Sequence, residues 1–346
     1  MIKTRLRALG FASIFAVVAV QSASAQTTTL KVHHFLPATS NAHTNLIKPW
    51  CDKINKDSNG RLQCQIYPAM QLGGTPAQLF DQARDGAVVI VWTVLSYQAG
   101  RFTKSEVFEL PFLIRSAEEG SRALWAYMEK NSKDELRGVH PIFMHVHDGA
   151  VLHSTSKSVA TLEDLKGLKI RAANRVNAVM LTALGATPVQ MPLPQVPESM
   201  TKGVVDGAMV PWEGVPAVKF QEIAKFSLET PADAGKFSNS IFAFVMNENK
   251  YKSLPADLQK VIDENGGIEM SGQAGRRAFD DVVEPFRKQA IENGDKVTSL
   301  SQDELKRWQA ASEKVYDAWF AEIAKKGGDG KRLLQDAREL LEKNRR

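Results

Sequence analysis

Closely spaced strand–helix units fill residues 161–213, and they limit the possible folds more than any other part of the chain. Residues 168–172 alternate as a strand, Asn174 is placed to cap the next helix, and residues 186–191 and 204–210 predict two more strands. Such units build an open, mostly parallel sheet of the α/β class. The capped helix has one apolar face, formed by Val176, Val179, Met180, Ala183 and Leu184.

Arg171 lies at the carboxyl end of one of these expected strands, just before the helix that begins at Asn174. Ligands of open α/β sheets bind at this edge. The planar guanidinium can hold a carboxylate through two parallel hydrogen bonds, and the helix N-terminus adds positive potential. We therefore count Arg171 and Asn174 as candidate ligand-binding residues. A surface or structural ion pair is the commoner role for such an arginine, and from the residues alone that alternative stays open.

Residues 1–26 have the pattern of a secretory signal peptide. Lys3, Arg5 and Arg7 precede an apolar run over residues 8–20, and small residues place the cleavage site after about Ala25. The apolar run is too short for a membrane anchor, so we expect an exported, soluble protein. Removing the three positive charges lowers the net charge from +5 to +2. A nearly neutral protein is a poor candidate for binding nucleic acid.

The mature chain of about 320 residues exceeds what one hydrophobic core usually holds, so we expect two lobes. Cys51 and Cys64 fall at the end of an expected helix and within the next strand. In an oxidising compartment they could form a disulfide, or they could remain two packed thiols. Zinc binding by this pair alone is disfavoured because zinc requires four ligands.

The rest of the chain continues the mixed pattern, with breaks expected at Gly266–Gly267 and at Pro285. Predicted strands cover residues 29–34, 61–67, 87–92, 105–112, 141–147 and 240–246. Predicted helices cover residues 42–56, 75–84, 117–131, 302–325 and 332–346.

Seven segments, in this order along the chain, resemble one known family. They are YPAMQLG (67–73), ARDGAV (83–88), FELPF (108–112), LEDLKGLKIR (162–171), LGATPVQMP (184–192), GVVDGA (203–208) and LPADLQK (254–260). The mature chain, nearly end to end, is similar to the substrate-binding proteins of tripartite ATP-independent periplasmic (TRAP) transporters, the DctP family. Each segment alone is weakly specific, but their shared order and spacing after a signal peptide make the resemblance strong.

The resemblance implies a two-lobed periplasmic-binding-protein fold of the type II-like class. Each lobe would be a mixed, mostly parallel sheet flanked by helices, with a central ligand cleft and a long helix spanning both lobes. We expect one lobe to comprise residues 27–148 plus about 240–278, and the other residues 149–239 plus about 279–346. The family also implies a periplasmic receptor that delivers an organic acid to a two-part membrane permease. We expect this receptor to be a monomer without cofactor or metal.

Arg171 matches the family's carboxylate-binding arginine. Many members, including those for sialic acids and C4-dicarboxylates, carry a second arginine in the segment aligned with residues 148–155, where this chain has Val151. One fixed cation beside an apolar residue predicts a monocarboxylate with an apolar body.

Trp212 and Glu213 follow another expected strand. They could wall the pocket and accept a hydrogen bond from a ligand hydroxyl or from Arg171. Some family members that bind 2-oxo acids hold a cation near this segment, so a metal is conceivable there. The ordinary alternative is a core tryptophan and an acidic residue at a helix start, where the helix dipole favours negative charge.

Four residues of the first lobe are further candidates for lining the pocket. Trp92 and Tyr97 follow the expected buried strand, and His34 and Phe35 begin the first strand–helix loop. Aromatic rings at strand ends fit a stacking surface for a flat ligand, although each ring could equally serve only to pack the core.

His145 and His147 share one strand face. As metal ligands they would need partners from His33, His34 or His43, and buried histidines bonded to neighbours are the commoner outcome. We expect His147 to be a neutral donor to the ligand. The sequence lacks the HExxH, GxSxG, P-loop and GxGxxG motifs, so no enzyme class is indicated.

The sequence thus predicts a non-enzymatic periplasmic receptor for an organic anion. The first choice of ligand is an aromatic or apolar monocarboxylate such as an arylglyoxylate, arylacetate, benzoate or hydroxycinnamate. Aliphatic 2-oxo or hydroxy acids and C4-dicarboxylates are alternatives. A metal-binding receptor and a periplasmic hydrolase are the alternatives from other classes.

Overall fold

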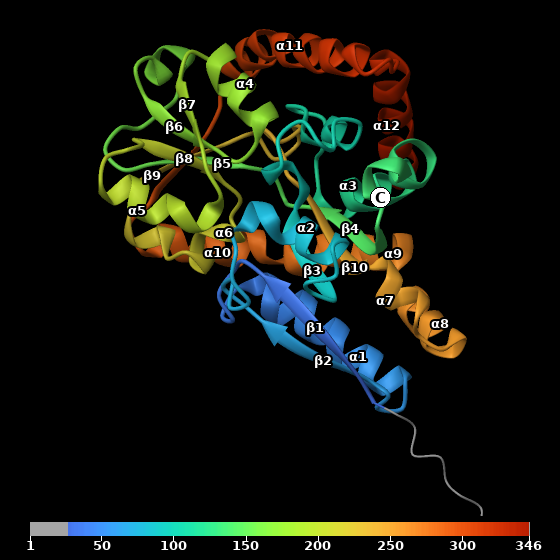
Figure 1. Cartoon of the computed structure of the whole chain (residues 1–346). Helices are drawn as coiled ribbons and strands as arrows, with labels where there is room; N and C mark the ends of the chain where they lie inside the picture. Colours follow the sequence, from blue (N-terminus) through green and yellow to red (C-terminus); the bar gives the residue numbers. More distant parts are fainter. Residues whose placement is uncertain (1–26, 346) are drawn as a thin grey trace, which may run out of the picture.

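Two β-sheets, each covered by helices, form two lobes of an α/β fold, which confirms the predicted fold class (Figure 1). The computed structural model describes residues 27–345, so the predicted signal peptide lies outside the described residues. The first sheet has the strand order β2-β1-β3-β10-β4, and the second β11-β9-β5-β8-β6-β7. In the part of the chain that is described, no helix is both long and apolar enough to cross a membrane.

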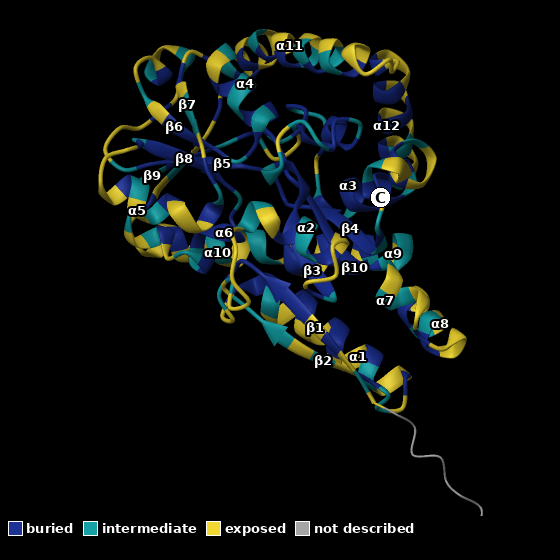
Figure 2. Cartoon of the chain, in the orientation of Figure 1, coloured by how far each residue is buried: buried dark blue, intermediate teal, exposed yellow. Residues whose placement is uncertain are grey.

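The first sheet is mixed. Its strands β1 (Thr28–His34), β2 (Leu62–Tyr67) and β3 (Ile90–Val94) are parallel, while β10 (Ile241–Asn247) runs antiparallel to both β3 and β4 (Val139–Val146). Every residue of β3 and β10 is buried, because helices cover both faces of the sheet (Figure 2). The helices of this lobe are α1 (Lys48–Asp57), α2 (Leu79–Arg84), α3 (Ala117–Tyr127), α7 (Glu248–Lys252), α8 (Ala256–Glu264) and α9 (Gly267–Ala278).

The second sheet contains the strand–helix units expected in residues 161–213. Its strands β6 (Lys169–Ala172), β7 (Thr187–Gln190) and β8 (Gly207–Val210) are parallel. The Asn174 side chain accepts a hydrogen bond from the backbone N–H of Asn177, which makes it the expected cap. The other elements are β5 (Val151–Ser154), β9 (Phe226–Glu229), β11 (Lys296–Ser299), α4 (Arg175–Ala183), α5 (Val196–Thr201), α6 (Gly214–Ala217) and α10 (Val283–Glu292).

The helix expected to span both lobes is interrupted between α9 and α10. The 3-10 turn η10 (Asp280–Val282) separates them, and the Asp280 carboxylate accepts hydrogen bonds from the backbone N–H groups of Ala117 and Glu118, at 2.7 and 2.8 Å. Pro285 falls in the first turn of α10, where its missing N–H is tolerated. The chain also passes between the sheets at residues 147–150 and 230–240.

The two C-terminal helices lead back toward the first lobe. Helix α11 (Gln302–Lys325) packs on α4, and Trp319 Nε1 donates to the carbonyl of Thr103 at 2.8 Å. Helix α12 (Gly330–Asn344) then packs against α3. Helix α12, which the sequence assigned to the second lobe, thus contacts a helix of the first lobe. The lobe boundaries stay a prediction.

Residues 105–109 form a 3-10 turn, so the prediction of a strand beginning at residue 105 is wrong for these residues. The Glu135 carboxylate accepts hydrogen bonds from the backbone N–H groups of Lys104, at 2.7 Å, and Ser105, at 3.1 Å. These donors are thereby satisfied without a neighbouring strand. A contact 30 residues away in the chain decides the local structure, and local patterning does not reveal it.

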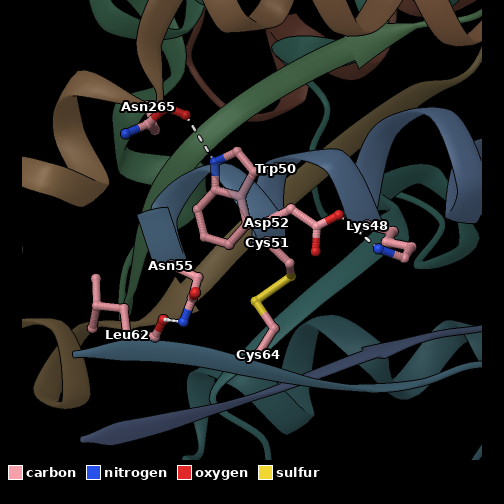
Figure 3. The surroundings of a disulfide bond; sticks show 8 residues. All are labelled: Lys48, Trp50, Cys51, Asp52, Asn55, Leu62, Cys64 and Asn265. Atoms are coloured by element: carbon pink, nitrogen blue, oxygen red, sulfur yellow. Dashed lines mark hydrogen bonds and ion pairs between the residues drawn. A yellow bond between two sulfur atoms is a disulfide. The ribbon is translucent and has the colours of Figure 1, made fainter. Parts of the chain in front are cut away.

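A disulfide joins Cys51 of α1 to Cys64 of β2, with 5.6 Å between the Cα atoms (Figure 3). This settles the choice that the sequence left open. Closing a loop of this size stabilises the fold by about 3 kcal/mol in the chain-entropy treatment. Next to it, Trp50 Nε1 donates to the carbonyl of Asn265 at 2.8 Å, so α1 is fixed to the sheet and to the end of α8.

Candidate functional site

A cavity lies between the two lobes and is lined by residues of both. The space between the lining residues has a volume of about 490 Å³, which includes the part that is open to solvent. Six of the nine predicted site residues line it, namely Phe35, Trp92, Tyr97, His147, Arg171 and Glu213. The other lining residues are Leu36, Val94, Ala150, Ala173, Asn177, Leu193, Met209, Pro211, Ser238, Ser240 and Phe242.

Arg171 is a buried cation without an anionic partner. Its side chain is held at the end of β6 by hydrogen bonds from Nε to the carbonyl of Met191, at 2.9 Å, and from Nη1 to the carbonyl of Met209, at 2.7 Å. The residue is only 2% exposed, and among residues 27–345 Tyr97 is the one side chain that stabilises its charge. Burial lowers the pKa of Arg171, but an arginine remains charged. An unpaired buried charge is costly, and an anion in the cavity would offset this cost.

Tyr97 places a hydroxyl group beside this cation. The hydroxyl oxygen accepts a hydrogen bond from the backbone N–H of Leu193 at 3.1 Å and one from Arg171. Burial raises the pKa of Tyr97, so the group stays protonated. With its oxygen occupied as an acceptor, the hydroxyl can donate its proton to a ligand.

His147 is a second neutral donor. Its Nδ1 accepts a hydrogen bond from the backbone N–H of Gly149 at 2.9 Å, so the ring proton resides on Nε2. Gly149 has φ of +106°, in the region that favours glycine, and this turn aims its N–H back at the ring. Burial, together with the nearby His145 and Arg171, lowers the pKa of His147 to about 3. The imidazole is therefore neutral at pH 7.

Stacked aromatic rings form the apolar wall of the cavity. Trp92 lies between Phe35, with 5.1 Å between ring centroids, and Phe242, with 5.0 Å, and all three rings are nearly parallel. Trp92 Nε1 donates to Nε2 of His145 at 2.8 Å. The one polar atom of the indole is thus satisfied inside the protein, and the rings offer a ligand only apolar surface.

Glu213 contributes a second carboxyl group to the lining. The residue is 3% exposed, and burial raises its pKa to about 8 although its side chain accepts a hydrogen bond from the backbone N–H of Ala42. It is therefore mainly uncharged at pH 7. Among the described residues, its Oε1 has no hydrogen-bond partner. Since Glu213 is neutral and Arg171 is the one Lys or Arg among the described lining residues, the cavity carries a net charge of about +1.

The other three predicted site residues lie behind the cavity wall. Trp212 lines a second cavity instead, and its Nε1 donates to Glu229 at 2.7 Å. His34 hydrogen-bonds with His43 at 2.9 Å and packs edge-on against Trp92. Asn174 caps α4 and donates to the carbonyl of Asn239 at 3.0 Å. All three hold the segments that carry lining residues.

Val151 does not line the cavity that holds Arg171, contrary to the prediction of an apolar residue beside the cation at this position. Ala150 lines both the cavity that holds Arg171 and the second cavity, whereas Val151 lines only the second one. The small apolar residue that shares the cavity with Arg171 is Ala150. Phe242 and Asn177 also line the cavity and were not predicted from the sequence. The two-residue period of the apolar strand β10 could have indicated Phe242. The position of Asn177, three residues after the cap at Asn174, could have indicated Asn177.

The histidines do not converge on a metal site. His145 and His147 each use a ring nitrogen in hydrogen bonds within the protein. From residue 27 to residue 345, no group of three or more His, Cys, Asp or Glu side chains is arranged to hold a metal ion.

Comparison with known proteins assigns the chain to a family. Residues 32–323 match the family described as bacterial extracellular solute-binding protein, family 7, or DctP. A TRAP solute-binding protein from Rhodoferax ferrireducens, solved with copurified benzoate, is 42% identical, with a TM-score of 0.90 over 92% of this chain and 98% of that one.

Two more solved structures are similar. A marine metagenome TRAP solute-binding protein specific for aromatic acid ligands, solved with 3-hydroxybenzoate, is 40% identical, with a TM-score of 0.91 over 93% of this chain and 100% of that one. A TRAP solute-binding protein from Bordetella bronchiseptica, with bound mandelate, is 27% identical, with a TM-score of 0.84 over 91% and 99% of the two chains. The family match covers most of the chain, and the protein therefore belongs to the DctP family of solute-binding proteins of TRAP transporters.

Proposed function

We propose that this receptor binds an aromatic monocarboxylate and delivers it to the membrane permease of a TRAP transporter. Family membership makes the chain a solute-binding receptor and not an enzyme. It also implies a membrane permease as partner and a periplasmic location. The proposal also includes a monomeric receptor, cleavage after about Ala25 and a permease of two subunits. The cleavage site rests on the small residues before it, and the two-part permease rests on the family resemblance.

The observation that carries the proposal is the unpartnered charge of Arg171 in a cavity that is otherwise uncharged. One carboxylate would neutralise it, with two guanidinium hydrogen bonds directed at its oxygens. Tyr97 and His147 would supply two neutral donors to the same group. A dicarboxylate would place a second negative charge in a buried site that has no second cation, which costs several kcal/mol.

The aromatic wall indicates the body of the ligand. A flat ring can lie against the stacked rings of Phe35, Trp92 and Phe242, where its apolar surface is removed from water. Benzoate, 3-hydroxybenzoate and mandelate, found in the similar structures, all combine one carboxylate with one aromatic ring. Aliphatic 2-oxo acids would leave this wall without a partner.

Closure of the lobes completes the site in this proposal. The lining comes from both lobes, so the ligand contacts all of it only when the lobes are together. Closure excludes water, and the ion pair with Arg171 is then stronger than in an open cleft. A ligand that prefers the closed state shifts the population toward it, and the permease can recognise that state.

A thermal-shift screen of the mature protein tests the proposed function. The panel comprises benzoate, hydroxybenzoates, mandelate, aliphatic 2-oxo acids, C4-dicarboxylates, sugar acids and zinc. An aromatic acid at 100 times its Kd is expected to stabilise the protein by about 2.7 kcal/mol. A response to 2-oxo acids, dicarboxylates or zinc alone would contradict the proposal. Recovery of a chemically altered acid after incubation would favour a hydrolase.

A further inference from the structure

The carboxyl group of Glu213 does not cap the helix that begins next to it. Glu213 stands at the N-cap of α6, yet its side chain makes no capping hydrogen bond there. Instead the carboxyl group reaches across to the backbone N–H of Ala42, the first residue of the η1 helical turn in the other lobe. Contact with both lobes fixes this side chain at the cavity wall.

The second feature is the missing partner of Glu213 Oε1. Buried polar atoms in folded proteins nearly always have a hydrogen-bond partner. Oε1 has none within residues 27–345, although the residue lines the cavity and is 97% buried. A group from the bound ligand would satisfy this atom.

The chemistry of the neighbouring groups limits what that ligand group can be. Arg171, Tyr97 and His147 are all donors and would be occupied by the carboxylate. Glu213 forms no ion pair with Arg171 within 4.0 Å, so it is free to contact another part of the ligand. In the uncharged carboxyl group Oε1 can donate a proton, and in the ionised group it accepts one. A hydroxyl group both donates and accepts, so it is a suitable partner in either state.

We infer that Glu213 determines specificity by forming a hydrogen bond through Oε1 with a hydroxyl substituent of the aromatic acid. This inference rests on the proposed function, because it assumes that Arg171 holds the carboxylate of the same ligand. The receptor then prefers hydroxylated aromatic acids to unsubstituted benzoate. Because Glu213 is also held by Ala42 of the opposite lobe, recognition of the hydroxyl is coupled to lobe closure.

The test is the ratio of the Kd for benzoate to the Kd for the best hydroxylated acid, measured by calorimetry. The hydroxylated panel consists of 2-, 3- and 4-hydroxybenzoate and mandelate. We expect the wild type to prefer at least one of them by about tenfold. Glu213→Gln keeps a neutral hydrogen-bonding group and retains most of this preference. Glu213→Met removes it, so that the ratio falls to about one. Glu222→Gln, an exposed change outside the cavity, leaves the ratio as in the wild type.

Each other result has one meaning. If the wild type binds benzoate without preferring any hydroxylated acid, or if Glu213→Met keeps the preference, the inference fails while the proposed function stands. If the Met variant weakens benzoate and hydroxylated acids equally, Glu213 acts only through its contact with Ala42, and the inference also fails. If the wild type binds no aromatic acid, the proposed function fails and the inference with it. The Met variant is expected to fold, because Met replaces a buried carboxyl group that lacks a hydrogen-bond partner. The Gln variant has nearly the same side-chain shape as Glu and provides a second test.

Discussion

At the scale of single residues, the cavity presents donors whose orientations are fixed before a ligand arrives. Two carbonyl groups hold the guanidinium of Arg171, the backbone N–H of Leu193 holds the hydroxyl of Tyr97, and that of Gly149 sets the tautomer of His147. Ordering these side chains is part of folding and not of binding. Such preorganisation raises affinity by lowering the entropy cost of association.

Tyr97→Phe is expected to weaken the binding of benzoate about tenfold, because it removes a hydrogen bond to a charged group and leaves the backbone N–H of Leu193 unpaired. The ring and its contact with Phe35 remain. Calorimetric titration of wild type and variant measures the change. Tyr67→Phe, in β2 and outside the cavity lining, serves as the matched control. Equal affinities of the Tyr97 variant and the wild type would show that the hydroxyl does not contact the ligand.

At the scale of the elements, α4 and its neighbours connect the two lobes beside the cavity. Arg175 of α4 forms an ion pair with Glu106 of the turn at residues 105–109, and the Glu106 side chain is almost fully buried. The amide of Asn177 donates to the hydroxyl of Ser238 at 3.1 Å. The ion pair joins the second lobe to the first, and the hydrogen bond joins α4 to the segment at residues 230–240 that crosses between the sheets. The ion pair therefore favours the closed arrangement.

Arg175→Met is expected to weaken ligand binding about tenfold or more, although Arg175 does not line the cavity. It leaves the buried Glu106 carboxylate without its partner in the closed state, and this cost is largely relieved when the lobes open. The dissociation rate should rise correspondingly, which stopped-flow measurements can follow. Arg307→Met removes an exposed ion pair with Glu163 and is the control. An unchanged dissociation rate would mean that the ion pair does not hold the lobes together.

Local signals predicted most elements but not those that depend on distant contacts. The cap at Asn174 and the helix at residues 302–325 follow from side chains close in sequence, and the structure has both. The turn at residues 105–109 depends on Glu135, and the orientation of Trp212 depends on Glu229. The periodicity of apolar residues predicts where strands end, and ligand sites of open α/β sheets form at these ends. It does not give the direction of a side chain whose partner belongs to another element.

At the scale of the whole molecule, two sets of buried groups make stability depend on pH in opposite directions. Burial raises the pKa of Glu109 and Glu213 from 4.5 to about 8, and that of Glu135 to about 7. The stability from these neutral carboxyl groups is complete below about pH 4.5 and is lost as the pH rises through 7 to 8. Burial lowers the pKa of four histidines from 6.5 to about 3, so their contribution is complete above about pH 6.5 and is lost as the pH falls toward 3. These histidines are His34, His145, His147 and His153.

The free energy of unfolding should therefore be greatest near about pH 6 and decline on both sides. Urea unfolding of the ligand-free protein between about pH 4 and pH 9 measures this. Glu109→Gln keeps an acceptor for the backbone N–H of Ile241 and cannot ionise, so the decline above about pH 6.5 should be smaller in this variant. Stability that rises steadily up to about pH 9 would show that these carboxyl groups are already ionised at neutral pH.

The most direct test of the account is a calorimetric titration of benzoate into the wild type and into Arg171→Met and Arg171→Lys. Loss of the buried cation should weaken binding by about 100-fold or more, since a ligand carboxylate would be left without its partner. Lysine keeps the charge but not the planar fork and should give an intermediate affinity. Arg61→Met, which removes an arginine paired with Asp257 far from the cavity, should bind as the wild type does. Undiminished benzoate binding by Arg171→Met would contradict the central claim that this one buried cation holds the ligand.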